Sequence, residues 1–125
     1  MKKTTFNVTV AALELENLLI EKMDISRASF HRRMIDYYLK YDRTINPNLL
    51  IKKRNNPNYV KKDTVEQIYL DENREKALAK IAEKYSTKDS RCGIGTVLFQ
   101  ALLSYCVVQS SIVFGEGFIK RMLGE

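Results

Sequence analysis

The sequence predicts a mainly α-helical protein with a short two-stranded antiparallel ribbon. A strand, an amphipathic helix and a second helix occur in this order twice, over residues 4–41 and 64–108. The strand segments alternate apolar and polar residues, whereas the helical segments repeat apolar residues every three or four positions. The 125 residues, 45% of them hydrophobic, are enough for one compact domain or for two small units that share a core.

The chain divides into four segments on this pattern. Residues 1–43 form the first unit, 44–63 a basic linker, 64–109 the second unit and 110–125 a C-terminal tail with a possible short helix. A unit of roughly 40 residues rarely folds alone. Each unit must therefore pair with the other unit or with another chain.

The repeat aligns residue by residue. A shift of sixty positions lays Phe6–Val10 over Glu66–Leu70, with Asn7 over Gln67 and Val8 over Ile68. After an apparent four-residue insertion, Ser26-Arg27 falls on Ser90-Arg91. Few matches are identities, so both true duplication and chance agreement between amphipathic helices stay open.

In the first unit, Phe6, Val8 and Val10 point to one face of the strand. Thr5, Asn7 and Thr9 point to the other face. A helix over residues 12–23 buries leucines and carries glutamates, and Ser26 is the expected N-cap of a helix that runs to Tyr41.

In the second unit, Asp71 is the expected N-cap of a helix whose buried stripe runs from Ala77 to Tyr85. A helix over residues 90–108 is apolar nearly all round and should be the most buried element. The segment 92–115 has no charged residue and is long enough to span a bilayer. Its polar stripe fits a helix packed between protein partners better than one in lipid, so we expect no membrane span. Lys2-Lys3 is followed by a polar strand rather than by the apolar run of a signal peptide, so we expect a cytoplasmic protein.

The net charge of +6 is concentrated at the N-terminus, in Lys2-Lys3, and in the linker, in Lys52-Lys53-Arg54 and Lys61-Lys62. This distribution favours contact with phosphate, and equally fits a solvated lysine-rich loop.

Catalysis is not expected. The chain has no paired carboxylates, no Ser/His/Asp or Cys/His arrangement, and no phosphate-binding glycine loop followed by Lys. Cys92 and Cys106 are too few and too far apart for a zinc knuckle, and His31, the only histidine, is expected on a helix surface. We expect no enzyme, no cofactor, no metal and no small-molecule effector.

The strand Phe6–Val10, the amphipathic helix after it and the second helix opening with Ser26-Arg27-Ala28-Ser29 resemble the ribbon-helix-helix DNA-binding proteins of the Arc and MetJ type, here as a tandem repeat. The resemblance covers about two thirds of the chain. It implies that paired strands enter the major groove and that the second helix of each unit holds a phosphate with its N-terminus. The implied base-contacting residues are Thr5, Asn7, Thr9, Val65, Gln67 and Tyr69, and the implied phosphate-contacting residues are Lys2, Lys3, Ser26, Arg27, Ser29, Ser90, Arg91 and Gly93.

The second unit departs from this pattern. Glu66 takes the inward position held by Phe6, and Val65 and Tyr69 replace the more hydrophilic Thr5 and Thr9. Two assemblies follow: an intrachain pseudo-dimer in which the two strands pair, which we favour, or a two-chain assembly in which each strand pairs with its own copy.

The expected function is sequence-specific binding of double-stranded DNA by a transcriptional repressor or plasmid-encoded regulator, with further copies associating along the DNA. An accessory role at a plasmid transfer or replication origin needs the same contacts. A helical protein-interaction module without DNA binding is the alternative from another class.

Overall fold

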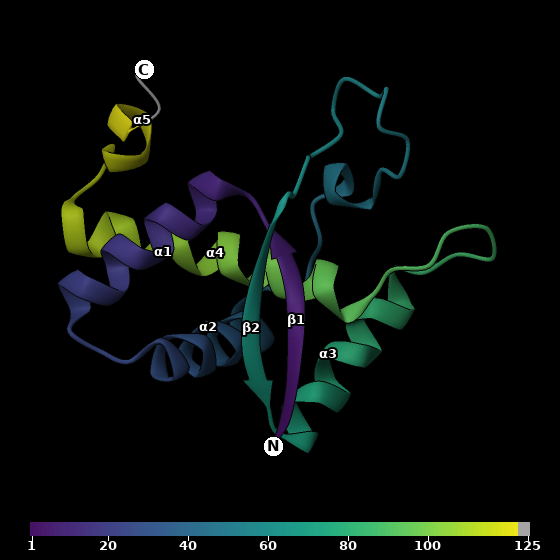
Figure 1. Ribbon diagram of the computed structural model, residues 1–125, viewed down its shortest axis with the longest axis horizontal. Helices are drawn as coiled ribbons and strands as arrows, with labels where there is room; N and C mark the ends of the chain where they lie inside the picture. The colour runs from purple at the N-terminus through teal and green to yellow at the C-terminus, as the bar shows by residue number, and fades with distance from the viewer. Residues whose placement is uncertain (123–125) are drawn as a thin grey trace.

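The computed structural model describes residues 1–122 and confirms a mainly helical chain with a two-stranded antiparallel sheet. The first half contains β1 (Lys2–Val8), α1 (Val10–Met23) and α2 (Arg27–Tyr41). A 3₁₀ helix, η1 (Pro47–Leu50), interrupts the connecting segment. The second half contains β2 (Thr64–Leu70), α3 (Glu72–Lys84) and α4 (Ile94–Phe114), followed by the short α5 (Phe118–Met122) (Figure 1).

The two strands pair with each other within one chain. Phe6 lies opposite Glu66, with Thr5 opposite Gln67 on one side of this pair and Asn7 opposite Val65 on the other. Side chains of a strand alternate between faces, so this register places both apolar rows on the inner face. Phe6, Val8, Ile68 and Leu70 are each at most 3% exposed.

Local capping explains where the first three helices begin. Thr9, Ser26 and Asp71 each accept a hydrogen bond from the backbone N–H three residues later, at 3.2, 3.0 and 2.8 Å. Such side chains satisfy one of the free N–H groups of a first helical turn. The N-caps expected at Ser26 and Asp71 are confirmed.

Helix α4 is the centre of the fold. It contacts β1, α1, α2 and α3, and Figure 1 shows it passing behind the strands, with α1 and α3 to either side. Its polar stripe fixes the segment after α2: Ser104 donates a hydrogen bond to Asp42 (2.7 Å), and the side-chain oxygen of Gln100 accepts one from the Asn46 N–H (2.7 Å). The helix is long and apolar enough to cross a membrane, yet here it packs among the other elements.

Both expected ends of the last long helix are wrong. The last long helix starts at Ile94 rather than at Ser90, and it continues past residue 109 to Phe114, where Gly115 ends it with φ +92°. A positive φ suits glycine and stops helical hydrogen bonding. The tail therefore begins as part of α4, and α5 is the short helix within it.

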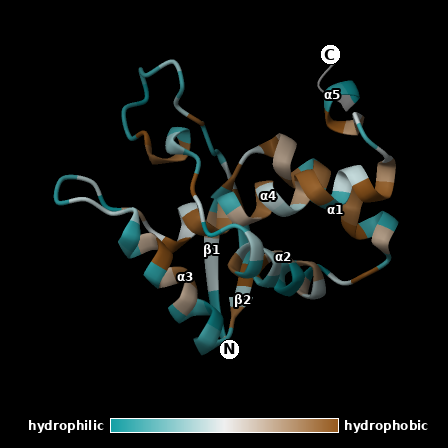
Figure 2. Cartoon of the chain, turned by 180° about the vertical axis from the view of Figure 1, so that it is seen from behind, coloured by the Kyte–Doolittle hydropathy of each residue, from teal (hydrophilic) through white to brown (hydrophobic). Residues whose placement is uncertain are grey.

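One hydrophobic core joins both halves. Its members come from both strands, the four long helices and η1, so neither unit has a core of its own. In Figure 2, α1, α3 and α4 all carry hydrophobic (brown) segments. Val10, expected on the apolar face of the first strand, opens α1 instead and is 52% exposed. Leu18, one of the leucines that the first helix was expected to bury, is 44% exposed.

Candidate nucleic-acid interface

The outer face of the ribbon carries two side-chain rows open to solvent. One row is Lys3, Thr5 and Asn7 from β1; the other is Val65, Gln67 and Tyr69 from β2. All six residues are exposed, with Val65 at 62% and Tyr69 at 56%. Five of the six expected base-contacting residues therefore share one surface, which we call the ribbon face.

Thr9, the sixth expected base contact, is not on the ribbon face. The strand ends at Val8, and the Thr9 hydroxyl caps α1. The third outward residue of β1 is instead Lys3, at the start of the strand, where it lies opposite Tyr69. Lys2 points away from this row and forms an ion pair with Glu75 (3.3 Å).

The N-terminus of α2 lies beside the β2 side of the ribbon. A pocket of about 330 Å³ is lined by residues of α2 and by the outward side chains of Gln67 and Tyr69. The α2 contribution is Arg27, Ala28, His31 and Arg32. Ser26, the N-cap that precedes α2, is exposed and accepts the Ser29 N–H, so the expected phosphate contacts Ser26 and Ser29 lie at the first turn of this helix.

Arg27 differs from the free phosphate clamp that the sequence suggested. Its guanidinium donates to the buried carboxylates of Glu16 and Glu66, the latter at 3.2 Å, and to the side chain of Asn17. Arg32, one turn later, is exposed and lines the same pocket, and it has no ion-pair partner within residues 1–122. Sequence reasoning missed Arg32, although its spacing from Ala28 places both on one helical face.

The expected second clamp is arranged differently. Ser90 precedes α4 in a turn, where its N–H donates to the Thr87 hydroxyl (3.0 Å), and Arg91 is exposed in the same loop. Gly93 is the N-cap and contributes no side-chain hydrogen bond. Two residues on, a Cβ added to Gly95 would stand 3.6 Å from the Phe6 Cβ, so the start of α4 packs beneath the ribbon.

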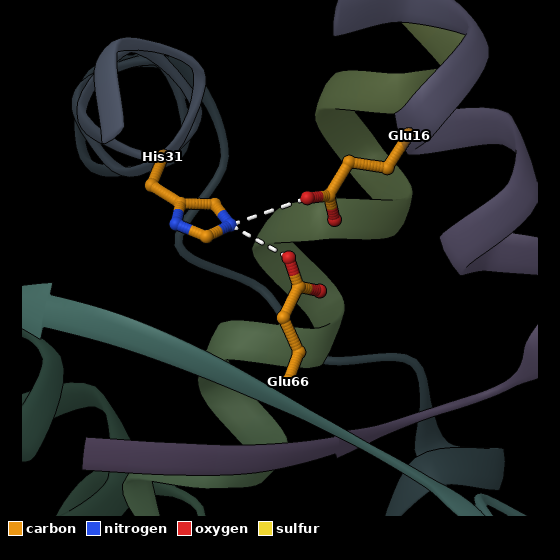
Figure 3. Close-up of side chains that lie close together, drawn as sticks. All are labelled: Glu16, His31 and Glu66. Carbon is orange, nitrogen blue, oxygen red and sulfur yellow. Dashed lines mark hydrogen bonds and ion pairs between the residues drawn. The ribbon is translucent and has the colours of Figure 1, made fainter. Parts of the chain in front are cut away.

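Beneath the ribbon lies a buried polar cluster of Glu16 from α1, His31 from α2 and Glu66 from β2 (Figure 3). The His31 Nε2 is 2.8 Å from Glu66 Oε1 and 3.3 Å from Glu16 Oε2. The side chains of Glu16, His31 and Glu66 are 0%, 5% and 5% exposed. The expectation of a surface histidine is wrong, because α2 turns His31 toward the core beside Phe30 and Phe6.

The cluster perturbs its own ionisation. Burial raises the pKa of Glu16 to about 7, and the neighbouring Glu66 acts in the same direction. Burial alone would lower the pKa of His31, but hydrogen bonds to the two carboxylates raise it to about 8. Burial alone would raise the pKa of Glu66, yet hydrogen bonds from His31 and Glu16 and the charge of Arg27 lower it. Chemically, an imidazole and two carboxylates could hold a metal ion.

The sequence indicates the inward positions of two members of this cluster, Glu66 and Glu16. The inward position of Glu66 follows from strand alternation, and Glu16 falls next to Leu15 in the apolar stripe of α1. Neither pattern indicates that the two glutamates meet His31, because this requires the pairing of β1 with β2. Comparisons with known protein families, with curated proteins and with solved structures give no match for this chain.

Proposed function

We propose that the protein binds double-stranded DNA sequence-specifically, with the ribbon face in the major groove. The supporting observation is a paired, two-stranded ribbon whose outer rows are exposed along their whole length. A two-stranded ribbon fits the major groove, where each base pair presents a distinct pattern of donors and acceptors.

We further propose that the chain is an intrachain pseudo-dimer of two ribbon-helix-helix units. The central pair, Phe6 and Glu66, joins the two residues that the sixty-residue shift treats as equivalent, as a local twofold axis requires. Placing Gly93, the N-cap of α4, over Ser26, the N-cap of α2, matches each buried residue of α2 with a buried residue of α4. These matched pairs are Phe30 with Val97, His31 with Leu98, Met34 with Ala101, Ile35 with Leu102, and Tyr38 with Tyr105.

Asn7 and Gln67 are the residues that we assign to base recognition. They are equivalent in the two strands and lie on either side of the central pair. A side-chain amide can give and accept one hydrogen bond each with adenine, and loss of such a contact costs roughly 1–3 kcal/mol of discrimination. Thr5 and Tyr69 add a hydroxyl on each strand. Val65 offers only apolar contact, which suits a thymine methyl group.

Phosphate contacts flank this face. Lys3 projects from the ribbon itself, and Arg32 with the first N–H groups of α2 lies at its side. Helix N-termini attract anions through their free N–H groups and the helix dipole. The exposed linker residues Lys52, Lys53 and Arg54 add positive charge that a longer duplex could reach.

The test begins with selection of bound duplexes from a random library, followed by fluorescence anisotropy on the selected site. Asn7→Ala and Gln67→Ala should each relax base preference, whereas Asn48→Ala, an exposed amide outside the ribbon, should not. Lys3→Ala and Arg32→Ala should weaken binding to all sequences and reduce the salt slope by about 1 each. Equal binding of the parent and the two ribbon variants to every duplex would refute the proposal.

The biological role that we propose is that of a cytoplasmic transcriptional regulator or repressor, with an accessory role at a plasmid origin as the alternative. Binding to duplexes from upstream of its own gene, compared with origin DNA, separates the two. Exposed apolar residues on α4, Val107 (53%) and Ile112 (71%), support contacts between copies bound along DNA. A protein that binds no duplex but co-purifies with a partner would instead be an interaction module.

A further inference from the structure

The Glu16–His31–Glu66 cluster places three metal-ligating atoms together in the interior. One imidazole nitrogen and one oxygen from each carboxylate all lie within 4.8 Å of one another. Figure 3 shows the imidazole and both carboxylates directed toward a common centre. The three side chains come from α1, α2 and β2, so an ion here would link both helices of the first half to the second strand.

The matched positions in the two halves show that the fold does not need polar groups here. Placing Asp71, the N-cap of α3, over Thr9, the N-cap of α1, matches Glu16 with Leu78. The corresponding match between α2 and α4 pairs His31 with Leu98, and Glu66 lies opposite Phe6. Leu78, Leu98 and Phe6 are all buried core residues. Glu16 and His31 of the first half thus correspond to apolar residues of the second half, and Glu66 of the second half corresponds to an apolar residue of the first.

Each carboxylate also retains an unused oxygen. His31 and Arg27 both contact Glu16 Oε2 and Glu66 Oε1. Glu16 Oε1 and Glu66 Oε2 are buried without a hydrogen-bond partner among residues 1–122. A buried carboxylate oxygen without a partner is unfavourable, because it has lost its water and gained nothing in return.

The cluster has a net negative charge that a cation could compensate. When His31 is neutral, two carboxylates face the single permanent positive charge of Arg27, so one negative charge stays uncompensated. The Arg27 side chain reaches the cluster from the protein surface and is 42% exposed, whereas the carboxylate of Glu16 is fully buried. A guanidinium at this position can remain hydrogen-bonded to carboxylates that also bind a metal, as outer-shell groups commonly do.

We propose that Glu16, His31 and Glu66 form a binding site for one divalent transition-metal ion of the zinc type. Imidazole nitrogen and carboxylate oxygen together are ligands that such ions accept, and three protein ligands leave a further position for water. Binding requires neutral His31 and ionised glutamates, so the ion takes the place of the protons that otherwise balance the cluster. The inference does not depend on DNA binding.

The experiment uses tag-free full-length protein stripped with EDTA, in a C92A/C106A background that removes both thiols as ligands. Zn²⁺ binding is measured by calorimetry, Co²⁺ binding by its visible absorption, and stability by thermal unfolding. We expect one ion per chain and a melting temperature that rises with Zn²⁺ concentration, as specific binding to the folded state requires. Glu16→Gln and His31→Leu should each weaken binding about 100-fold or more. Glu21→Gln, an exposed glutamate of the same helix, should not.

A variant that keeps the fold protects the test against misfolding. The variant E16L/H31L/E66F, here called the apolar triple variant, replaces each ligand with the apolar residue at its matched position (Leu78, Leu98 or Phe6) and should fold without binding Zn²⁺ or Co²⁺. Binding by the parent that is no tighter than binding by this variant would overturn the proposal. Metal binding by His31→Leu that is as tight as binding by the parent would also overturn the proposal. Neither metal binding nor thermal unfolding reports on DNA binding, so a protein that binds no metal could still bind DNA as proposed.

Discussion

Replacing Arg27 with alanine should destabilise the metal-free fold. In the structure its guanidinium contacts Glu16 and Glu66, whose side chains are 0% and 5% exposed. Removing one partner of a buried ion pair costs about 3–5 kcal/mol, because the other charge is left buried and uncompensated. The remaining cationic partner would be His31, and only when it is protonated.

Two features of the cluster reduce this cost. The Arg27 side chain is 42% exposed, so solvent screens part of its interaction, and exposed pairs contribute at most about 1 kcal/mol. Glu16, whose pKa is already raised to about 7, can also take up a proton instead of remaining charged. We therefore expect a loss of about 2–3 kcal/mol in unfolding free energy at pH 8, and about 1 kcal/mol less at pH 6.

The assay is urea unfolding of parent and variant at the two pH values, with EDTA present and circular dichroism as the signal. Arg32→Ala is the matched control, since Arg32 is exposed on the same helix and should change stability by no more than about 0.5 kcal/mol. An Arg27→Ala protein as stable as its parent at pH 8, but weaker in DNA binding, would show that Arg27 acts on phosphate. Arg27 would then not stabilise the buried carboxylates.

Three further predictions concern stability. In metal-free protein, the raised pKa values of Glu16 and His31 mean that their stabilisation is present below their unfolded values of 4.5 and 6.5, and is lost as pH rises through about 7 and 8. Unfolding free energy should therefore fall from pH 6 to pH 8.5, and a parallel fall in the apolar triple variant would contradict this cause. Tyr38→Phe removes the buried hydroxyl that donates to the Thr44 carbonyl (2.8 Å) and should cost about 1 kcal/mol in chemical unfolding; no change would mean that water replaces the bond. Gly95→Ala should fold normally, because its Cβ would meet Phe6 at an ordinary 3.6 Å, whereas Gly95→Leu should lower the melting temperature; tolerance of leucine would show that α4 stands off the ribbon.

Sequence by itself determined the local features of this protein. Strand alternation set which side chains of residues 3–8 and 64–70 face outward, and Ser26 and Asp71 fixed the starts of two helices, because these effects act over a few neighbouring residues. The exposure of Asn7 and Gln67 follows from that alternation once one face is buried.

Tertiary structure alone decided which strands pair and in what register. It also decided where α4 begins and ends, and which residues surround Glu66. His31 lies 35 positions from Glu66 and 15 from Glu16 in the chain, so no local pattern can bring them together. Their meeting depends on the packing of α1, α2 and β2 against one another, and that packing also turns Arg27 from a candidate phosphate contact into a partner of buried carboxylates.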